Sequence, residues 1–361
     1  MPNLEKELHN GNGNGNGING NTKIDEDSCI NPHSFGIIGG GWYGCHIATS
    51  LRALGFRVKL FEQHSDCYMK HLATTSSGCI WASIMPVTVS RDGFMRFVEH
   101  YPELSRIVPF NIYAVPTQDS LLDYNTYKAT MASSGVAFTE GAPAGVHITN
   151  VDGIMCVPKR VLLLSKARAY FEAALKGALE LGQQVEDGVL IEGERFDFVV
   201  DATWGHYMDL DLEVIYEATL LLYYEGPSEF PAVTLVDGPL ASVYPTEMPG
   251  LFTLSSVPHT PLGQFKTAAE ARAARDDVSP ATISAKRALM EEQIMHYLPT
   301  FLKTFRYIGP QLAVKTKPLG AYDDRSCRVS RRGRVFSVMS GKIDTIFFAH
   351  ERILSLIDDG S

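Results

Sequence analysis

The chain has 361 residues, a length that suggests about two domains. Hydrophobic residues make up 45% and charged residues 20%, a balance typical of a globular protein. Its formal net charge of −9 argues against a nucleic-acid partner, because nucleic-acid-binding proteins carry a basic footprint. No apolar run reaches the roughly 18 residues of a membrane span, and the N-terminus lacks the features of a secretory signal. We therefore expect a cytoplasmic protein that acts on a small molecule, with no membrane partner; the oligomeric state stays open.

The six cysteines are scattered and form no C-x-x-C pair. They are Cys29, Cys45, Cys67, Cys79, Cys156 and Cys327. This spacing favours free thiols in a reducing compartment over a disulfide framework or a zinc site. We expect no metal.

Residues 1–33 are predicted to be a disordered tail. Asparagine and glycine alternate over residues 10–17, and such a segment has almost no side chain to bury. Packing therefore cannot offset the entropy cost of ordering its backbone.

The next 30 residues predict a compact βαβ unit. Phe35–Ile38 is an apolar run suited to a buried strand, and apolar residues then recur at helical spacing over Trp42–Leu54. Gly55 stands where a helix commonly ends, and Val58–Glu62 is a second predicted strand.

The turn inside this unit carries the G-x-G-x-x-G pattern over residues 39–44. The pattern suits a dinucleotide because Gly39 permits a tight turn, Gly41 lets the backbone approach a pyrophosphate, and Gly44 lets helix and strand pack closely. The N–H groups at the helix start favour the phosphates. Glu62, 18 residues beyond Gly44, is placed to accept hydrogen bonds from a ribose, and its charge disfavours NADP.

Later elements alternate between helix and strand. We predict helices at Tyr124–Ser133, Val161–Leu181 and Ala281–Tyr297, and a closing helix at Lys342–Ile357 that Ser340 and Gly341 open. The predicted strands are a short one around Val185, then Val189–Ile191, Phe196–Thr203, Glu217–Tyr224, Ala232–Val236, Ala241–Tyr244, Leu251–Ser255 and Arg334–Met339.

Three separated segments together resemble the glutathione-reductase-type flavoproteins, and more closely the D-amino-acid-oxidase-like FAD-dependent oxidoreductases. They are the 36–62 unit, residues 197–205 and residues 340–344. In that family the second segment returns beneath the cofactor and ends in Ala-Thr-Gly, whereas here Trp204 precedes the glycine. The third opens a helix whose N-terminus points at the flavin and stabilises its reduced form. Lys342 either adds to that field or is a solvated lysine.

The resemblance implies an α/β fold with a Rossmann-like FAD-binding domain and a β-rich substrate domain. The expected division is 34–72, 155–206 and 325–361 for the FAD domain, with 73–154 and 207–324 for the substrate domain. The residues expected to contact FAD are Gly39, Gly41, Trp42, Tyr43, Gly44, Glu62, Gln63, Ser76, Val185, Ala202, Thr203, Gly341, Lys342 and Ile343.

Much of residues 35–357 more narrowly resembles an uncharacterised bacterial group of FAD-dependent oxidoreductases. The shared stretches are Ser90–Phe94, Asn111–Pro116, Ser242–Glu247 and Lys315–Pro318. They do not identify a substrate.

One stretch departs from that group. Where its members carry a histidine-containing run near the flavin, this chain has Cys79–Val87, which contains no histidine. Codons for this stretch, read in another frame, can encode such a run, so we hypothesise a local frameshift; the alternative is ordinary divergence. The coding DNA decides between them.

The expected function is an FAD-dependent oxidoreductase that transfers a hydride from a C–H bond of an amine or alcohol type of substrate to flavin N5. Tyr244, Lys317 and Arg325 are the catalytic candidates, the first to orient substrate and the cations to bind a substrate carboxylate. Alternatively, Tyr244 is an aromatic residue on a sheet face and both cations are surface residues. Two further alternatives are an FAD-binding protein whose turnover is impaired by the altered segment, and an NAD-dependent dehydrogenase.

Deleting residues 1–33 should leave the melting temperature unchanged, because the tail carries little apolar surface to bury. Thermal unfolding of the full chain and of the shortened chain checks this. A large drop after deletion would show that the tail docks on the fold.

Overall fold

The computed structural model describes residues 32–67, 87–185, 190–191, 194–236, 238–319, 327–339 and 342–358. Nearly all of the predicted N-terminal tail lies outside this part of the chain, as do residues 79–86 of the altered segment. Ser76, Arg325 and Gly341 also lie outside it.

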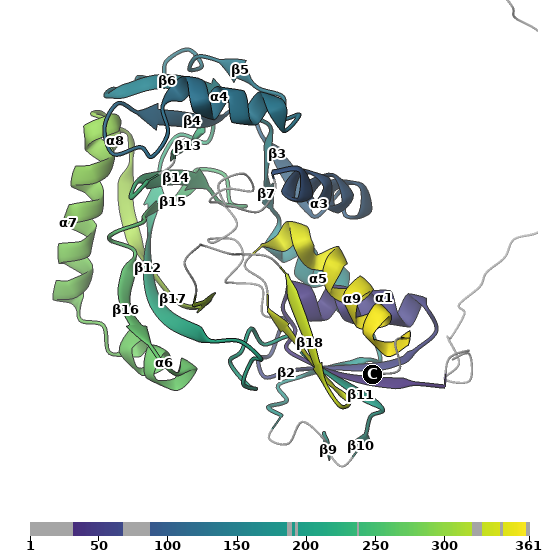
Figure 1. The fold of residues 1–361 in the computed structure, drawn as a ribbon. Helices are drawn as coiled ribbons and strands as arrows, with labels where there is room; N and C mark the ends of the chain where they lie inside the picture. Colours follow the sequence, from purple (N-terminus) through teal and green to yellow (C-terminus); the bar gives the residue numbers. More distant parts are fainter. Residues whose placement is uncertain are drawn as a thin grey trace, which may run out of the picture.

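A six-stranded sheet forms the first of two structural units (Figure 1). Its order is β18 (Arg328–Arg332), β19 (Val335–Met339), β11 (Phe198–Asp201), β1 (Ser34–Ile38), β2 (Arg57–Glu62) and β8 (Leu179–Leu181). All neighbouring pairs are parallel except β18 with β19. Because β1 is central and β11 lies beside it, Ile38 and Asp201 end their strands at the same edge. Ligands of open parallel sheets bind outside that edge.

Helices α1 (Trp42–Ala53), α5 (Leu164–Ala174) and α9 (Ile346–Asp358) lie together on one side of this sheet (Figure 1). One core cluster joins them to the strands, and it includes Phe35, Leu51, Phe171, Ile353 and Phe97 of α3 (Val87–His100). Gly55 adopts a φ of +84° just after α1, as expected of the residue that ends a helix. The amphipathic pattern of Trp42–Leu54 thus positions the helix that opens at the glycine turn.

The second unit is built on a larger, mostly antiparallel sheet. Its order is β16 (Pro261–Phe265), β12 (Val214–Glu225), β15 (Leu251–Ser256), β14 (Ala241–Pro245), β13 (Ala232–Leu235), β4 (Asn111–Pro116), β6 (Val151–Cys156) and β5 (Thr139–Glu140), with β17 (Arg306–Pro318) paired to β12. Helix α7 (Pro280–Tyr297) runs along its outer face, away from the first sheet (Figure 1). Met290 and Ile294 of α7 pack with Leu222 and Leu254 of the sheet.

Shorter elements complete the described chain. They are α4 (Tyr124–Ser133), α6 (Ala268–Asp276), α8 (Phe301–Thr304), η2 (Ile343–Thr345), the ribbon of β3 (Ser105–Val108) with β7 (Lys159–Leu162), and the hairpin of β9 (Leu190–Ile191) with β10 (Glu194–Arg195). Among the described residues, no helix combines the length and apolar character needed to span a bilayer.

The predicted fold class, α/β with a Rossmann-like domain, is confirmed. The sheet memberships suit the expected discontinuous division, although α3 belongs to the core of the first unit rather than to the second. The exact domain boundaries stay a proposal.

Two local predictions were wrong. The helix expected over Val161–Leu181 is confined to Leu164–Ala174, because Gly177 turns the chain at a φ of +80° and Leu179–Leu181 pairs with β2 as strand β8. The apolar residues of this segment fit helical spacing, but the last of them, Leu179 and Leu181, belong to a strand that pairs with the edge of the sheet at β2. Val185 lies outside any strand.

A buried histidine of the first unit connects α1 to α9 and to Tyr101, the residue that follows α3. His46 of α1 is 1% exposed; its Nδ1 lies 2.7 Å from the Tyr101 hydroxyl and its Nε2 lies 3.0 Å from His350 Nδ1 on α9. Burial, and then the charges of His350, His100 and Arg96, hold the pKa of His46 well below the ordinary value. Burial also lowers the pKa of His350. Both rings are therefore neutral at neutral pH.

The free energy of unfolding should fall as the pH drops below the ordinary histidine pKa of about 6.5. In that range the histidines bind protons in the unfolded chain but not in the folded chain, where their pKa is lower. The slope is at most about 1.4 kcal/mol per pH unit for each such proton. Denaturant unfolding between pH 7.5 and 5 measures it, and His46→Gln should flatten the dependence. The exposed His296 supplies the matched control, His296→Gln, which should leave the slope unchanged. Identical slopes for wild type and His46→Gln would contradict the assignment.

Candidate dinucleotide site

The glycine turn after β1 has a geometry that only glycine satisfies at two positions. Gly39 adopts a φ of +102°, and a Cβ there would lie 3.1 Å from the Ala202 carbonyl oxygen. A Cβ on Gly44 would lie 1.9 Å from the Gly39 carbonyl oxygen, which no adjustment of a side chain relieves. The G-x-G-x-x-G pattern thus reflects close packing of α1, the turn and β11.

The start of α1 is open to an anion. Gly41 is the N-cap residue, and a glycine has no side chain with which to cap the helix. The first-turn N–H groups of a helix have no partner within the helix, and its dipole adds partial positive charge at the same end. Because Gly41 carries no Cβ, a phosphate can approach this backbone closely.

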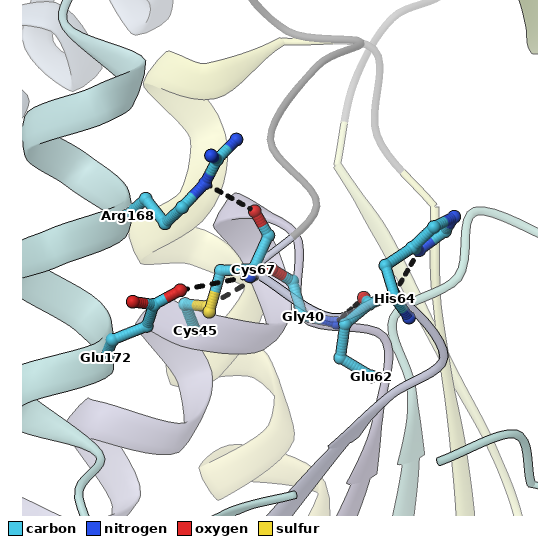
Figure 2. Close-up of polar contacts among 7 residues, drawn as sticks. All are labelled: Gly40, Cys45, Glu62, His64, Cys67, Arg168 and Glu172. Carbon is cyan, nitrogen blue, oxygen red and sulfur yellow. Dashed lines mark hydrogen bonds and ion pairs between the residues drawn. The ribbon is translucent and has the colours of Figure 1, made fainter. Parts of the chain in front are cut away.

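Glu62 ends β2 and closes the turn from the other side. Its carboxylate is buried, and Oε2 accepts a hydrogen bond of 2.7 Å from Gly40 N (Figure 2). The other oxygen, Oε1, accepts from His64 N at 2.9 Å and also contacts His64 Nδ1. Carboxylate oxygens have further lone pairs for a ribose hydroxyl. The carboxylate therefore orients the turn and keeps acceptor capacity for a ligand.

A cavity of about 390 Å³ opens beside Glu62. It brings together five of the sequence-predicted cofactor residues, namely Gly39, Glu62, Gln63, Val185 and Thr203. Its other polar or charged lining residues, which sequence reasoning missed, are His64, Gln183, Gln184, His206, Tyr207, Arg272 and Arg275. The two arginines come from α6, more than 200 residues beyond the glycine turn, and no local motif marks them.

The segment after β11 is held against the turn by Asp201. Its Oδ1 accepts from Thr203 N at 2.8 Å and from Thr203 Oγ1 at 2.6 Å, and its Oδ2 accepts from Met208 N at 3.1 Å. Burial raises the pKa of this carboxyl, and the hydrogen bonds from Thr203 and Met208 oppose that rise. Trp204, at the family's departure point, adopts a φ of +64°, and its carbonyl accepts from Thr316 Oγ1 at 2.7 Å. The chain therefore still turns after β11, although Trp204 stands before Gly205 where the family has Ala-Thr-Gly.

The segment that begins at Lys342 is connected to α1 through Tyr43. Its hydroxyl donates to the Lys342 carbonyl at 2.5 Å and lies 2.7 Å from Thr345 Oγ1. Lys342 and Ile343 are 6% and 5% exposed, so the alternative of a solvated Lys342 is wrong. Tyr43 thus links the glycine-turn helix to the start of η2.

Trp42 has a different role from its neighbour. Its side chain is fully buried against Phe97 and Phe171 in the core, so only its backbone N–H can face a phosphate.

The catalytic candidates occupy different surroundings. Tyr244 is 2% exposed; its hydroxyl donates to the Arg160 carbonyl at 3.4 Å, and its ring faces Lys159 Nζ at 4.7 Å. Lys317 Nζ forms an ion pair of 2.8 Å with the buried Glu217. A substrate carboxylate would therefore have to compete with Glu217 for this ammonium.

Comparisons with known proteins agree with this geometry. A sequence model of the NAD(P)-binding Rossmann-like domain matches residues 37–70. The FAD-dependent monooxygenase FPY4 of Fusarium mangiferae is 82% identical over the whole of both chains. The FAD-dependent monooxygenase kojA of Aspergillus flavus is 25% identical over 90% of this chain and 85% of its own.

Solved structures share the fold at low identity. Glycine oxidase from Geobacillus kaustophilus superposes with a TM-score of 0.65 at 14% identity, covering 91% of this chain and 95% of that one. FAD-bound L-α-glycerophosphate oxidase from Mycoplasma pneumoniae also gives 0.65, at 12% identity, covering 90% and 94%.

The fold, the glycine turn and the similarity to the Fusarium protein together define an FAD-dependent oxidoreductase, and the fold is the one that glycine oxidase shares. Within that class the chain belongs to the family of the FAD-dependent monooxygenases, as its similarity to the Fusarium protein shows. The expected bacterial group is therefore wrong, since the full-length relatives are fungal. The alternative of an NAD-dependent dehydrogenase is not retained.

The described residues fit FAD. The uncapped helix start suits the pyrophosphate, Glu62 suits the adenosine ribose, and the cavity beside Val185 suits the adenine. Each contact remains a proposal for this chain.

Glu62→Ala should weaken FAD binding by about 1–3 kcal/mol, because it removes charged hydrogen bonds and leaves Gly40 N without its acceptor. Glu62→Gln, which keeps an acceptor for Gly40, should lose less. Fluorescence titration of the cofactor-free chain measures both, and the exposed Glu229 provides a control in Glu229→Ala. Unchanged affinity in a folded Glu62→Ala variant would count against the ribose assignment.

Proposed function

We propose that this chain oxidises a small organic molecule with FAD as its bound cofactor. The observation that carries the proposal is the buried Glu62 carboxylate bonded to Gly40 beside an uncapped helix start. FAD, when bound, supplies the acceptor for two electrons from the substrate. The protein's part is to hold that cofactor and to position the substrate against it.

The proposed reaction is hydride removal from a C–H bond next to nitrogen or oxygen. The fold supports it, because the structural neighbours include proteins named glycine oxidase and glycerophosphate oxidase, although this likeness concerns the fold alone. Tyr244 is the proposed orienting residue, with its ring fixed against Lys159. Lys317 and Arg325 remain proposed carboxylate ligands, and Lys317 would have to give up its ion pair with Glu217 to bind a substrate.

Monooxygenation is the second candidate. The full-length relatives are named FAD-dependent monooxygenases, and such enzymes place one atom of dioxygen in the product. The two candidates use the same cofactor site, so the geometry of Glu62 and the glycine turn does not separate them. They differ in the fate of dioxygen and in the source of electrons.

Anaerobic mixing of the FAD-loaded protein with a panel of small amines, alcohols and hydroxy acids should bleach the flavin absorbance without a nicotinamide. Turnover of the active compound under ¹⁸O₂ should then give a product that contains no ¹⁸O. A requirement for NADH or NADPH, together with one ¹⁸O atom in the product, would establish monooxygenation instead. Loaded protein that no compound bleaches, with or without nicotinamide, would support impaired turnover through the altered 79–87 segment.

A further inference from the structure

Helix α6 belongs to the second unit but lines the dinucleotide cavity of the first. It is fixed at its start by a reciprocal cap: Thr267 Oγ1 accepts from Glu270 N at 3.2 Å, and Glu270 Oε2 accepts from Thr267 N at 3.1 Å. Ala268 and Ala271 are buried against Tyr216 and Val314. With this apolar side held on the sheet, Arg272 and Arg275 reach the cavity that Glu62 lines.

Arg272 is connected to the loop that follows β11. Its guanidinium donates to His206 Nδ1 at 3.3 Å, and the His206 ring packs edge-on against Tyr216 at 5.7 Å. The Tyr216 hydroxyl in turn donates to the Gly205 carbonyl at 2.5 Å. The arginine is thus oriented by the same loop whose first residues, Ala202 and Thr203, pack on Gly39.

The two arginines differ in how their charge is compensated. Arg275 forms two hydrogen bonds with the Asp276 carboxylate, at 2.8 and 2.9 Å. Within the described parts of the chain, Arg272 forms no ion pair, and its guanidinium forms a hydrogen bond with His206 Nδ1. A guanidinium has five N–H donors in a fork that matches phosphate oxygens. Arg272 therefore brings a positive charge and spare donors to the cavity wall.

We propose that Arg272 binds the phosphate-bearing half of the dinucleotide from the second unit, at the cavity that Glu62 also lines. This inference rests on the proposed FAD site. The charges are complementary: among the residues that line the cavity, Glu62 offers a carboxylate to the ribose, and Arg272 offers a cation to the pyrophosphate, which carries two negative charges. His206 is the positioning residue that aims the guanidinium.

Through this contact between Arg272 and the phosphates, the bound cofactor connects the two units. The glycine turn and Glu62 belong to the first sheet, whereas α6 is packed on β12 and β17 of the second. A ligand that contacts both units stabilises their relative placement, because it binds the arrangement in which both sets of contacts can form.

The test compares three ligands that differ only in charge. The full chain, freed of cofactor, is titrated with adenosine, AMP and ADP, and separately with FAD. Arg272→Met should weaken ADP and FAD binding about tenfold or more and leave adenosine binding within about twofold, since only the phosphates lose a charged hydrogen bond. Arg272→Lys should recover part of the loss. The wild type's affinity for ADP should also fall more steeply with added KCl than that of Arg272→Met.

Arg306→Met is the matched control, because Arg306 is an exposed arginine paired with Glu225 on the same sheet, outside the cavity lining. It should change no affinity. An equal loss for adenosine and ADP in Arg272→Met would overturn the phosphate assignment, and so would unchanged binding of both. Failure of the wild type to bind FAD as well as ADP would instead contradict the proposed function on which the inference rests.

Discussion

The hydrogen bond from Gly40 N to Glu62 Oε2 joins the ends of the two strands on which the candidate site depends. It places an acidic group at the carboxyl edge of a parallel sheet while α1 begins a few residues away at Gly41, an N-cap residue that has no capping side chain. A negative side chain and a positive helix end at opposite sides of one turn suit a ligand that carries both a ribose and phosphates. Since Glu62 is buried, the contact is protected from water and holds the turn in one conformation.

Convergence of distant segments follows from this parallel arrangement. Strand β11 lies beside β1 in register, so Ala202 and Thr203 reach the glycine turn from more than 150 residues away. Tyr43 then fastens the start of η2 to α1, which brings in the last segment of the chain. The second unit adds α6 to the cavity wall. Three segments that each carry a weak signal thereby form one site.

Sequence reasoning succeeded where one physical requirement dominated. The glycine turn was predictable because close backbone approach demands glycine, and the spacing to Glu62 correctly placed that carboxylate beside the turn; its ribose contact stays a prediction. Strands β12, β13, β14 and β15 of the second sheet were also predicted, because glycine and proline turns separate them, whereas the other five strands of that sheet were not. Helix α6 was not predicted, because its alanine and arginine residues do not form a recognisable apolar face in the sequence. Its buried side is defined only by packing of Ala271 against β12 and β17. The burial of Lys342 depends likewise on tertiary packing rather than on local sequence.

We propose that the cavity beside Glu62 holds FAD. The most direct measurement is the visible absorption spectrum of the purified full chain, followed by mass spectrometry of the small molecule that heat denaturation releases. If FAD occupies the cavity, the spectrum shows flavin absorption bands, and denaturation releases intact FAD in a ratio approaching one per chain. A colourless protein that takes up no added FAD, or one that releases a nicotinamide dinucleotide instead, would contradict it.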